Sequence, residues 1–357
     1  MIDGIPVLDG IIHAYNLHPS NYANRHAAIV SQLITGMVAA MSVPGFSAPP
    51  DVYLRDWSIE ETARLVFTES ATDLAVYHVL PLNAFHDGMC SLDKAIEARQ
   101  RWPNRIICYC GVDPLQGQAA LDELDRQVEL LRPVGVKLYP NSWVGAEARG
   151  WRMDDPEVAF PVFERAQKLG LKVVAIHKAV PLGPVPMDAY RVDDIDRAAI
   201  AFPGLNFEIV HGGMAFLEET AWQLARFSNV FVNLEVTSAY VAIRPKVFDR
   251  ALSTLMSIGG AVMLDRLVWG TGAVAFHPQP LLESFVRRFE LSRETLECTG
   301  SAQLTTADKR KILFDNFATM SGIDVSAMLA ATAHDEFTLP GTGALQRPFS
   351  THRLARA

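Results

Sequence analysis

The stretch that decides the fold is LKVVAIHKAVPLGPVPMDAYRVDDIDRAAIAFPGLNFEIVH, residues 171–211. It begins with the apolar run LKVVAIH (171–177) and ends with the apolar run LNFEIVH (205–211), and each run finishes on a histidine. Both runs are continuous rather than alternating in polarity, which is typical of strands buried on both faces of a parallel sheet. The stretch therefore predicts two parallel strands joined by a crossover.

Six further runs of the same kind occur along the chain, with amphipathic segments such as 119–132 and 155–170 between them. They are PVLDGIIH (6–13), TDLAVYHV (72–79), RIICYCGV (105–112), VGVKLYP (134–140), NVFVNLEV (229–236) and RLVWGTG (266–272). Eight strands alternating with helices predict an α/β fold, a (β/α)₈ TIM barrel over residues 1–325, rather than an open doubly wound sheet. No GxGxxG or GxxxxGK[ST] pattern follows a strand, which removes the main support for a nucleotide-binding fold.

Two regions fall outside this repeat. Residues 14–70 form a long insertion after the first strand, and an insertion of this length usually builds a lid or a subunit contact. Residues 326–357 form an extended C-terminal tail punctuated by Gly and Pro, which we expect to lie across the surface or against a partner subunit.

Composition excludes several classes of partner. The 357 residues carry a net charge of −8, so there is no basic excess with which to bind nucleic acid. No apolar run approaches the roughly 20 residues that span a bilayer, so we expect no membrane association. The opening MIDGIPVLDG lacks the features of a secretory signal, and four cysteines in so long a chain suggest no disulfide framework. We therefore expect a cytoplasmic protein.

Metal-binding residue types stand at the carboxyl ends of several predicted strands, where TIM barrels place their active sites. His13, His177 and His211 end the first, fifth and sixth strands, and Glu235 lies at the end of the seventh. Any one of these histidines is ordinarily a core residue bonded to a backbone carbonyl. Three of the chain's ten at separate strand ends favour a metal site, since imidazole and carboxylate groups bind Zn, Fe or Mn.

Two further candidates lie at the same end of the predicted barrel. Lys137, in the fourth strand, could bind a substrate carboxylate or bridge metals, although a lysine that only reaches the barrel mouth is as common. The eighth strand leads into VWGTGAVAFHPQP (268–280), which carries His277 between Phe276 and Pro278. We expect this loop to shape the site mouth and to point His277 inward as a ligand, with an ordinary loop histidine as the alternative.

Several segments resemble the amidohydrolase superfamily, in the branch related to aminocarboxymuconate semialdehyde decarboxylase. They include RIICYCGVDP (105–114), GVKLYP (135–140), VVAIH (173–177), FPGLNFEIVHGG (202–213), NVFVNLE (229–235) and KRKILFDNFATMSGID (309–324). The resemblance implies a metal site with ligands from a first-strand D-x-H-x-H and an eighth-strand G-[ST]-D. Here Ile11 and Gly272 replace two of those ligands. The site is therefore either rebuilt from residues such as Glu235 and His277, or no longer catalytic.

A smaller subgroup has segments similar to IIHAYN (11–16), KLYPNSW (137–143) and GTG followed by HPQP. It contains the hydroxylase component of 2-aminoisobutyrate monooxygenase. This resemblance implies a hydroxylase subunit of a multicomponent, non-haem metal-dependent monooxygenase acting on a small molecule such as an amino acid. A related amidohydrolase-like subunit, a ferredoxin and a reductase would be its partners.

Two alternatives remain open: a metal-dependent hydrolase or decarboxylase of a small carboxylated substrate, and a non-catalytic partner subunit with a degenerate metal site. In the enzymatic interpretations a divalent Fe, Mn or Zn ion is the cofactor, and its nuclearity is open. The expected metal ligands are His13, His177, His211, Glu235 and His277, and the expected catalytic residues are His211 and Lys137.

We predict that the chain works in an oligomer with a related amidohydrolase-like subunit. The 14–70 insertion and the tail are more surface than one barrel needs to cover itself, and an obligate interface buries about 2,000 Å² or more. Sedimentation velocity should show an assembly larger than one chain. A stable and active monomer would contradict the prediction.

Overall fold

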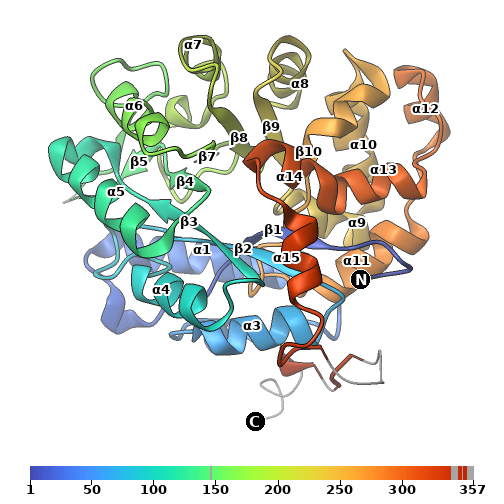
Figure 1. Ribbon diagram of the computed structural model, residues 1–357, viewed down its shortest axis with the longest axis horizontal. Helices are drawn as coiled ribbons and strands as arrows, with labels where there is room; N and C mark the ends of the chain where they lie inside the picture. Colours follow the sequence, from blue (N-terminus) through green and yellow to red (C-terminus); the bar gives the residue numbers. More distant parts are fainter. Residues whose placement is uncertain (145–146, 339–344, 348, 352–357) are drawn as a thin grey trace.

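The computed structural model describes residues 1–144, 147–338, 345–347 and 349–351. Its main sheet has eight strands in the order β1-β2-β3-β4-β7-β8-β9-β10, and every neighbouring pair is parallel (Figure 1). The strands are β1 (Leu8–Ile12), β2 (Leu74–His78), β3 (Ile106–Gly111), β4 (Gly135–Leu138), β7 (Val173–His177), β8 (Asn206–Val210), β9 (Val230–Asn233) and β10 (Leu267–Val268). Each lies inside its predicted run, so the eight predicted strands are confirmed.

Backbone hydrogen bonds close the sheet into a barrel between its first and last strands. Gly10 N–H donates to Trp269 O at 2.8 Å, and Gly272 N–H donates to Ile11 O at 3.0 Å. A Cβ on Gly10 would lie 2.7 Å from Trp269 O, so the close approach of the two chains requires a glycine there. The predicted TIM barrel is therefore confirmed.

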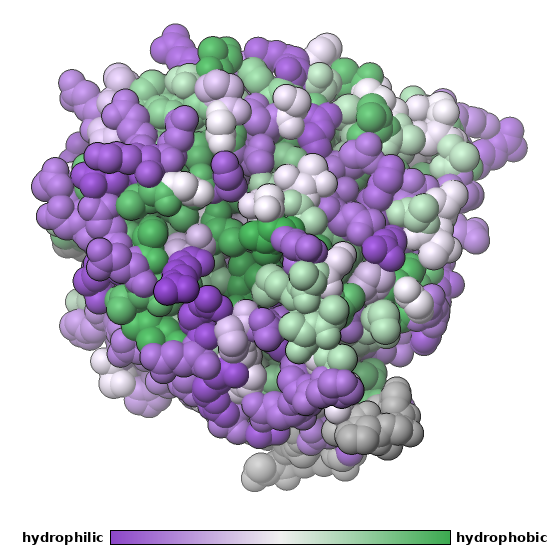
Figure 2. Space-filling model, in the orientation of Figure 1, coloured by the Kyte–Doolittle hydropathy of each residue, from purple (hydrophilic) through white to green (hydrophobic). Residues whose placement is uncertain are grey.

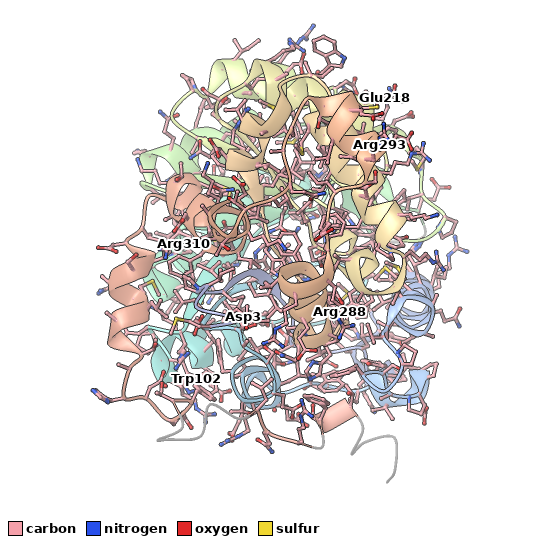
Figure 3. The ribbon with its side chains drawn as sticks, turned by 90° about the vertical axis from the view of Figure 1, so that its right-hand side faces the viewer. Asp3, Trp102, Glu218, Arg288, Arg293 and Arg310 are labelled. Carbon is pink, nitrogen blue, oxygen red and sulfur yellow. The ribbon has the colours of Figure 1, made fainter. Side chains whose placement is uncertain are left out.

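Helices surround the barrel, and a two-stranded antiparallel sheet of β5 (Asn141–Ser142) and β6 (Arg149–Gly150) follows β4 (Figure 1). The helices are α1 (Arg25–Met41), α2 (Pro50–Tyr53), α3 (Ile59–Thr68), α4 (Leu92–Arg101), α5 (Gln118–Leu131), α6 (Phe160–Lys168), α7 (Ile195–Ala201), α8 (Leu217–Arg226), α9 (Tyr240–Ile243), α10 (Pro245–Met256), α11 (Pro278–Glu283), α12 (Arg293–Thr299), α13 (Thr306–Arg310), α14 (Asn316–Ser321) and α15 (Val325–Ala331). Charged residues on α8, α12 and α13, labelled Glu218, Arg293 and Arg310, lie on the outside (Figure 3).

No single helix within the described ranges is long and apolar enough to cross a bilayer. One pair of helices, Pro245–Met256 with Gly260–Arg266, meets the criterion together by length and composition, with a bend of 104° between them.

The barrel interior changes from apolar to polar along its axis. Residues near the start of the strands, among them Leu8, Leu74 and Val173, form one buried cluster with Phe314 and Phe317 from the C-terminal part of the chain. Nearer the carboxyl ends of the strands, the residues on the same face of the sheet are buried polar ones: His78, Lys137, His177, Glu208 and Asn233. The carboxyl end of the barrel is therefore the polar end, as TIM barrels that carry active sites require.

Different segments cover the two ends of the barrel. α14 and α15 lie in front of the strands in Figure 1, and α1 from the predicted insertion is drawn fainter behind them. On the front face hydrophilic side chains cover most of the surface, and apolar side chains gather near the centre (Figure 2). The apolar end of the barrel therefore faces α14 and α15, and the polar end faces α1.

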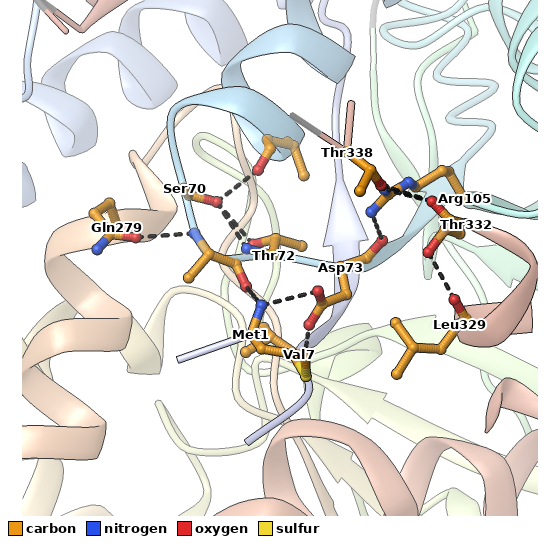
Figure 4. A network of polar contacts seen from close by, with 12 residues as sticks. Met1, Val7, Ser70, Thr72, Asp73, Arg105, Gln279, Leu329, Thr332 and Thr338 are labelled. Atoms are coloured by element: carbon orange, nitrogen blue, oxygen red, sulfur yellow. Dashed lines mark hydrogen bonds and ion pairs between the residues drawn. The ribbon is translucent and has the colours of Figure 1, made fainter. Parts of the chain in front are cut away.

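The described part of the C-terminal tail packs against this same chain. Asp335 forms an ion pair with Arg105. Arg105 also donates to Thr338 Oγ1 at 2.9 Å and to Asp73 O at 2.8 Å (Figure 4). Gln346 N–H donates to Thr68 O at 2.8 Å. The expected subunit contact of the tail stays a prediction, and residues 339–344, 348 and 352–357 lie outside the described ranges.

A buried carboxylate reinforces the closure of the barrel. Asp9 Oδ1 accepts hydrogen bonds from Thr271 N at 2.9 Å and from Ile11 N at 3.2 Å, and Oδ2 accepts one from the Thr271 hydroxyl. Burial raises the pKa of Asp9 to about 7, although these hydrogen bonds oppose the shift. Because the folded state favours the protonated acid, this group loses its stabilising contribution as the pH rises from about 4 to 7.

We predict that Asp9→Asn gains stability relative to the wild type as the pH rises. An asparagine can accept the same two backbone hydrogen bonds and has no charge to bury. The difference in Tm between variant and wild type should shift in favour of the variant by about 2 °C or more between pH 5 and pH 8. Thermal unfolding at both pH values measures this, and a difference that does not change with pH would contradict it.

Candidate functional site

A cavity of about 150 Å³ lies at the carboxyl ends of the strands. Its charged and imidazole side chains come from the barrel, namely His13, Lys137, His177, His211 and Glu235, and Tyr15 and Tyr139 also line it. Its apolar lining includes Leu33, Ile34 and Met37 from α1. The structure thus places five of the six residues singled out from the sequence around one cavity, and α1 of the 14–70 insertion covers it.

His211 enters the cavity because the chain turns sharply after β8. The strand ends at Val210, and His211 has a left-handed backbone with φ of 64°. A non-glycine residue rarely adopts this conformation, and such strain often occurs at functional sites. His177, by contrast, is the last residue of β7 and reaches the cavity by the ordinary alternation of a strand.

His177 and His211 face each other, with 3.0 Å between Nδ1 of His177 and Nε2 of His211. The other nitrogen of each ring is already engaged. Nε2 of His177 lies 2.7 Å from Val180 O, and Nδ1 of His211 contacts the Glu235 carboxylate. A carbonyl and a carboxylate only accept hydrogen bonds, so both of these nitrogens carry the proton.

The two nitrogens that face each other therefore both present lone pairs when the rings are neutral. Such an arrangement is repulsive unless a cation lies between them, either a proton on one ring or a metal ion. Two nitrogens bound to one metal at about 2.1 Å lie about 3.0–3.4 Å apart for right-angled to tetrahedral geometry. Metal-binding histidines also typically donate their second N–H to a carboxylate or carbonyl. The pair fits a bound metal ion on both counts.

The third donor is less well placed. His13 Nδ1 is buried and has no hydrogen-bond partner in the described part of the chain, and burial lowers the pKa of His13 to about 3, which keeps the ring neutral. Within the described ranges, however, no three His, Cys, Asp or Glu side chains converge on a single metal position. The protein thus supplies two converging imidazoles, with His13 lining the same cavity.

Glu235 occupies space that Gly272 leaves free. A Cβ on Gly272 would lie 2.2 Å from Glu235 Oε1, and φ of 70° at this position also favours glycine. Asn233 Oδ1 accepts from Glu235 N at 3.0 Å, and Asn233 Nδ2 donates to Glu208 Oε1 at 2.6 Å. Burial acts to raise the pKa of Glu235, but its contact with His211 outweighs burial and lowers it. Glu235 is therefore an ionised carboxylate that fixes the His211 ring.

Lys137 contributes a buried positive charge to the cavity. Its side chain is 1% exposed, and its ammonium group makes no hydrogen bond or ion pair with any residue the structure describes. Burial lowers the pKa of Lys137 to about 8, against the attraction of Glu208 and Glu235. Burial also raises the pKa of Glu208 to about 7.

The structure does not bring His277 to this cavity, and none of residues 272–280 lines it. His277 Nε2 lies 3.3 Å from Glu69 Oε2, and the ring packs against Phe46 and Phe349 with centroids 5.0 and 4.7 Å apart. The prolines of the loop begin α11, with His277 as the N-cap, instead of bracing a lid. The expected inward direction of His277 is therefore corrected.

Sequence reasoning missed the residues that complete the site from outside the strand ends. Leu33, Ile34 and Met37 lie in the insertion, and no pattern indicated which face of that helix would meet the barrel. Glu208 and Asn233 could have been found from the sequence, because each is a polar residue within a mainly apolar run. Each is also two residues away from a residue that lines the cavity, Val210 or Glu235, and alternate residues of a strand face the same side.

Comparisons with known proteins agree with this architecture. Among solved structures, an uncharacterised TIM-barrel protein of Bordetella bronchiseptica is 16% identical with a TM-score of 0.59, covering 91% of this chain and 100% of that one. A 2,6-dihydroxybenzoate decarboxylase from Rhizobium is 16% identical (TM-score 0.54, 89% and 99% covered). A 5-carboxyvanillate decarboxylase from Novosphingobium aromaticivorans is 12% identical (TM-score 0.53, 90% and 98% covered).

No curated protein matches the chain. The model of one protein family, described as amidohydrolase, matches residues 69–320, which is more than half of the chain. The eight-stranded barrel and the histidines at its carboxyl end agree with that match. The chain therefore belongs to the amidohydrolase family.

Proposed function

We propose that this protein is a metal-dependent decarboxylase of a small carboxylated molecule. The observation that carries the proposal is the pair of imidazole nitrogens of His177 and His211, which face each other at 3.0 Å while their other nitrogens are held by acceptors. This pair needs a cation between its members, and it lies in a cavity lined by a carboxylate, an ammonium group and an apolar roof.

The structural neighbours lend this reaction class further support. Two of those compared above are named decarboxylases, and the 5-carboxyvanillate enzyme is described with bound manganese. At 12–16% identity such neighbours share the fold alone, so the proposal rests on the side chains of this chain. A divalent ion held by His177 and His211, with His13 in the same cavity, is the cofactor that we propose.

Each part of the cavity has a task in such a reaction. Decarboxylation breaks the bond between the carboxylate and the substrate carbon that bears it. The electron pair stays on that substrate carbon, CO₂ leaves, and a proton takes its place. A bound divalent ion would act as a Lewis acid toward negative charge on a substrate oxygen. Glu235 orients the His211 ring, Lys137 carries a proton that it can give to the carbon, and the α1 side chains exclude water.

Two other functions were expected from the sequence. The hydroxylase subunit of a monooxygenase stays a prediction from resemblance, since neither the fold nor the compared structures support it. A non-catalytic partner with a degenerate site is favoured by one specific observation: no three metal-binding side chains converge in the residues described. Metal content separates these possibilities.

We predict about one divalent ion per chain in protein purified without added metal. Elemental analysis should find this ion in the wild type and less than about a tenth of it in His177→Ala and His211→Ala, since each removes one of the converging donors. The exposed His334 of the tail provides a control, and His334→Ala should keep the full amount.

The outcomes of this measurement are distinct. A wild type free of metal would contradict the decarboxylase proposal and favour the non-catalytic partner. Metal retained in both variants would show that the ligands lie elsewhere. Iron together with substrate-dependent uptake of dioxygen would favour the hydroxylase.

We predict that Gly272→Ala weakens metal binding by about tenfold to a hundredfold, the usual cost of disturbing a group that orients a metal ligand. The new Cβ would displace the Glu235 carboxylate, which then releases the His211 ring. Gly170 is a matched control, because it has φ of 81° but nothing within 4 Å of its ideal Cβ. Gly170→Ala should cost a similar backbone strain and leave metal affinity unchanged; equal affinities in the two variants would refute the role of Glu235.

A further inference from the structure

The Lys137 ammonium group is a buried charge whose contact in the structure is with an aromatic ring: Nζ lies 5.4 Å from the centroid of Tyr139. It is almost fully buried, it lines the cavity, and it has no hydrogen-bond or ion-pair partner among the described residues. Burying an unpaired charge costs several kcal/mol, so proteins seldom keep one without a partner that arrives later. The expected partner is an anion that enters the cavity.

The protein's own carboxylates near Lys137 make their polar contacts with other groups. Glu235 contacts His211, and Glu208 Oε1 accepts from Asn233 at 2.6 Å, while Glu208 Oε2 has no hydrogen-bond partner among the described residues. Both act on Lys137 through space, yet neither forms an ion pair with it within the described part of the chain. With Lys137 protonated and a cation between His177 and His211, the positive charges around the cavity outnumber the ionised Glu235, so a negatively charged ligand is attracted into the cavity.

The remainder of the cavity is small and, apart from Tyr15 and Tyr139, apolar. Leu33, Ile34 and Met37 line it from α1, and Leu182 lines it from the loop after β7. A volume of about 150 Å³ suits a compact body, since an engineered protein cavity of that size holds benzene. This lining offers no partner for a second charged group at the far end of a ligand.

We propose that Lys137 anchors the carboxylate of the substrate, and that the substrate is a small monocarboxylate with a compact aromatic or branched aliphatic body. This inference deepens the proposed decarboxylase function and rests on it. Lys137 gives the anion its position at the floor of the cavity, and the α1 side chains select a body that carries no further charge.

Calorimetric titration with two pairs of probes tests the anchor. Benzoate is compared with benzamide, and isobutyrate with isobutyramide, because each pair differs in charge and hardly in shape. The wild type should bind each acid at least about tenfold more tightly than its amide, as a charge-assisted hydrogen bond to Lys137 requires. Phthalate, with a second carboxylate, should bind more weakly than benzoate.

Variants test whether Lys137 causes the preference for the acid over the amide. In protein freed of metal by a chelator, Lys137→Met should bind acid and amide equally, while Lys168→Met, at an exposed position of α6, should keep the acid preference of the wild type. Met37→Trp, which fills the cavity from the roof, should weaken both probes and retain the charge. Circular dichroism checks the fold of each variant, and the acid–amide comparison in the wild type stands even if Lys137→Met fails to fold.

The results separate this inference from the proposed function. Equal binding of acids and amides by the wild type, or an acid preference that persists in metal-free Lys137→Met, overturns the anchor. The metal content of the purified wild type distinguishes the two proposals: an acid preference that depends on Lys137, in a wild type purified without any metal, supports the anchor and rejects the metal-dependent reaction.

Discussion

The contact chain from Glu235 through His211 to His177 is the interaction on which the site depends. It orients two imidazole rings whose remaining nitrogens meet at 3.0 Å, an arrangement that either a proton on one ring or a metal ion between the rings would stabilise. The chain in turn depends on backbone features of the barrel. The left-handed backbone of His211 directs its ring into the cavity after β8. The missing side chain at Gly272 leaves space for the Glu235 carboxylate.

The sequence predicted the barrel and the meeting of its strand ends because both follow from one regularity. Continuous apolar runs predict parallel strands, and the carboxyl ends of parallel strands meet at one end of a barrel. His13, His177 and His211 could therefore be placed together without a structure. The direction of His277 could not, because Pro278 is compatible both with a braced loop and with the first turn of a helix, and only the packing of Phe46 and Phe349 against the ring decides between them.

The sequence alone could not decide whether Gly272 means a lost or a rebuilt site, because the carboxylate of a different residue, Glu235, occupies the space beside it. A glycine where the related pattern has an acid indicated a lost function, but it equally indicated space. Since the Glu235 carboxylate lies where a side chain at 272 would be, the acid comes from β9 and its strand end instead of from β10. Ile11 has no such replacement, because it packs in the apolar part of the barrel interior.

The cavity is lined by two kinds of segment. Its polar floor comes from strand ends, which are tied into the barrel by backbone hydrogen bonds, whereas its apolar lining comes largely from α1 of the insertion and the loop after β7. Substitutions in α1 can therefore change which molecules fit without disturbing the groups that act on them. Selection on α1 alone would allow a lineage of such proteins to acquire new substrates while the inherited chemistry at the strand ends stays the same.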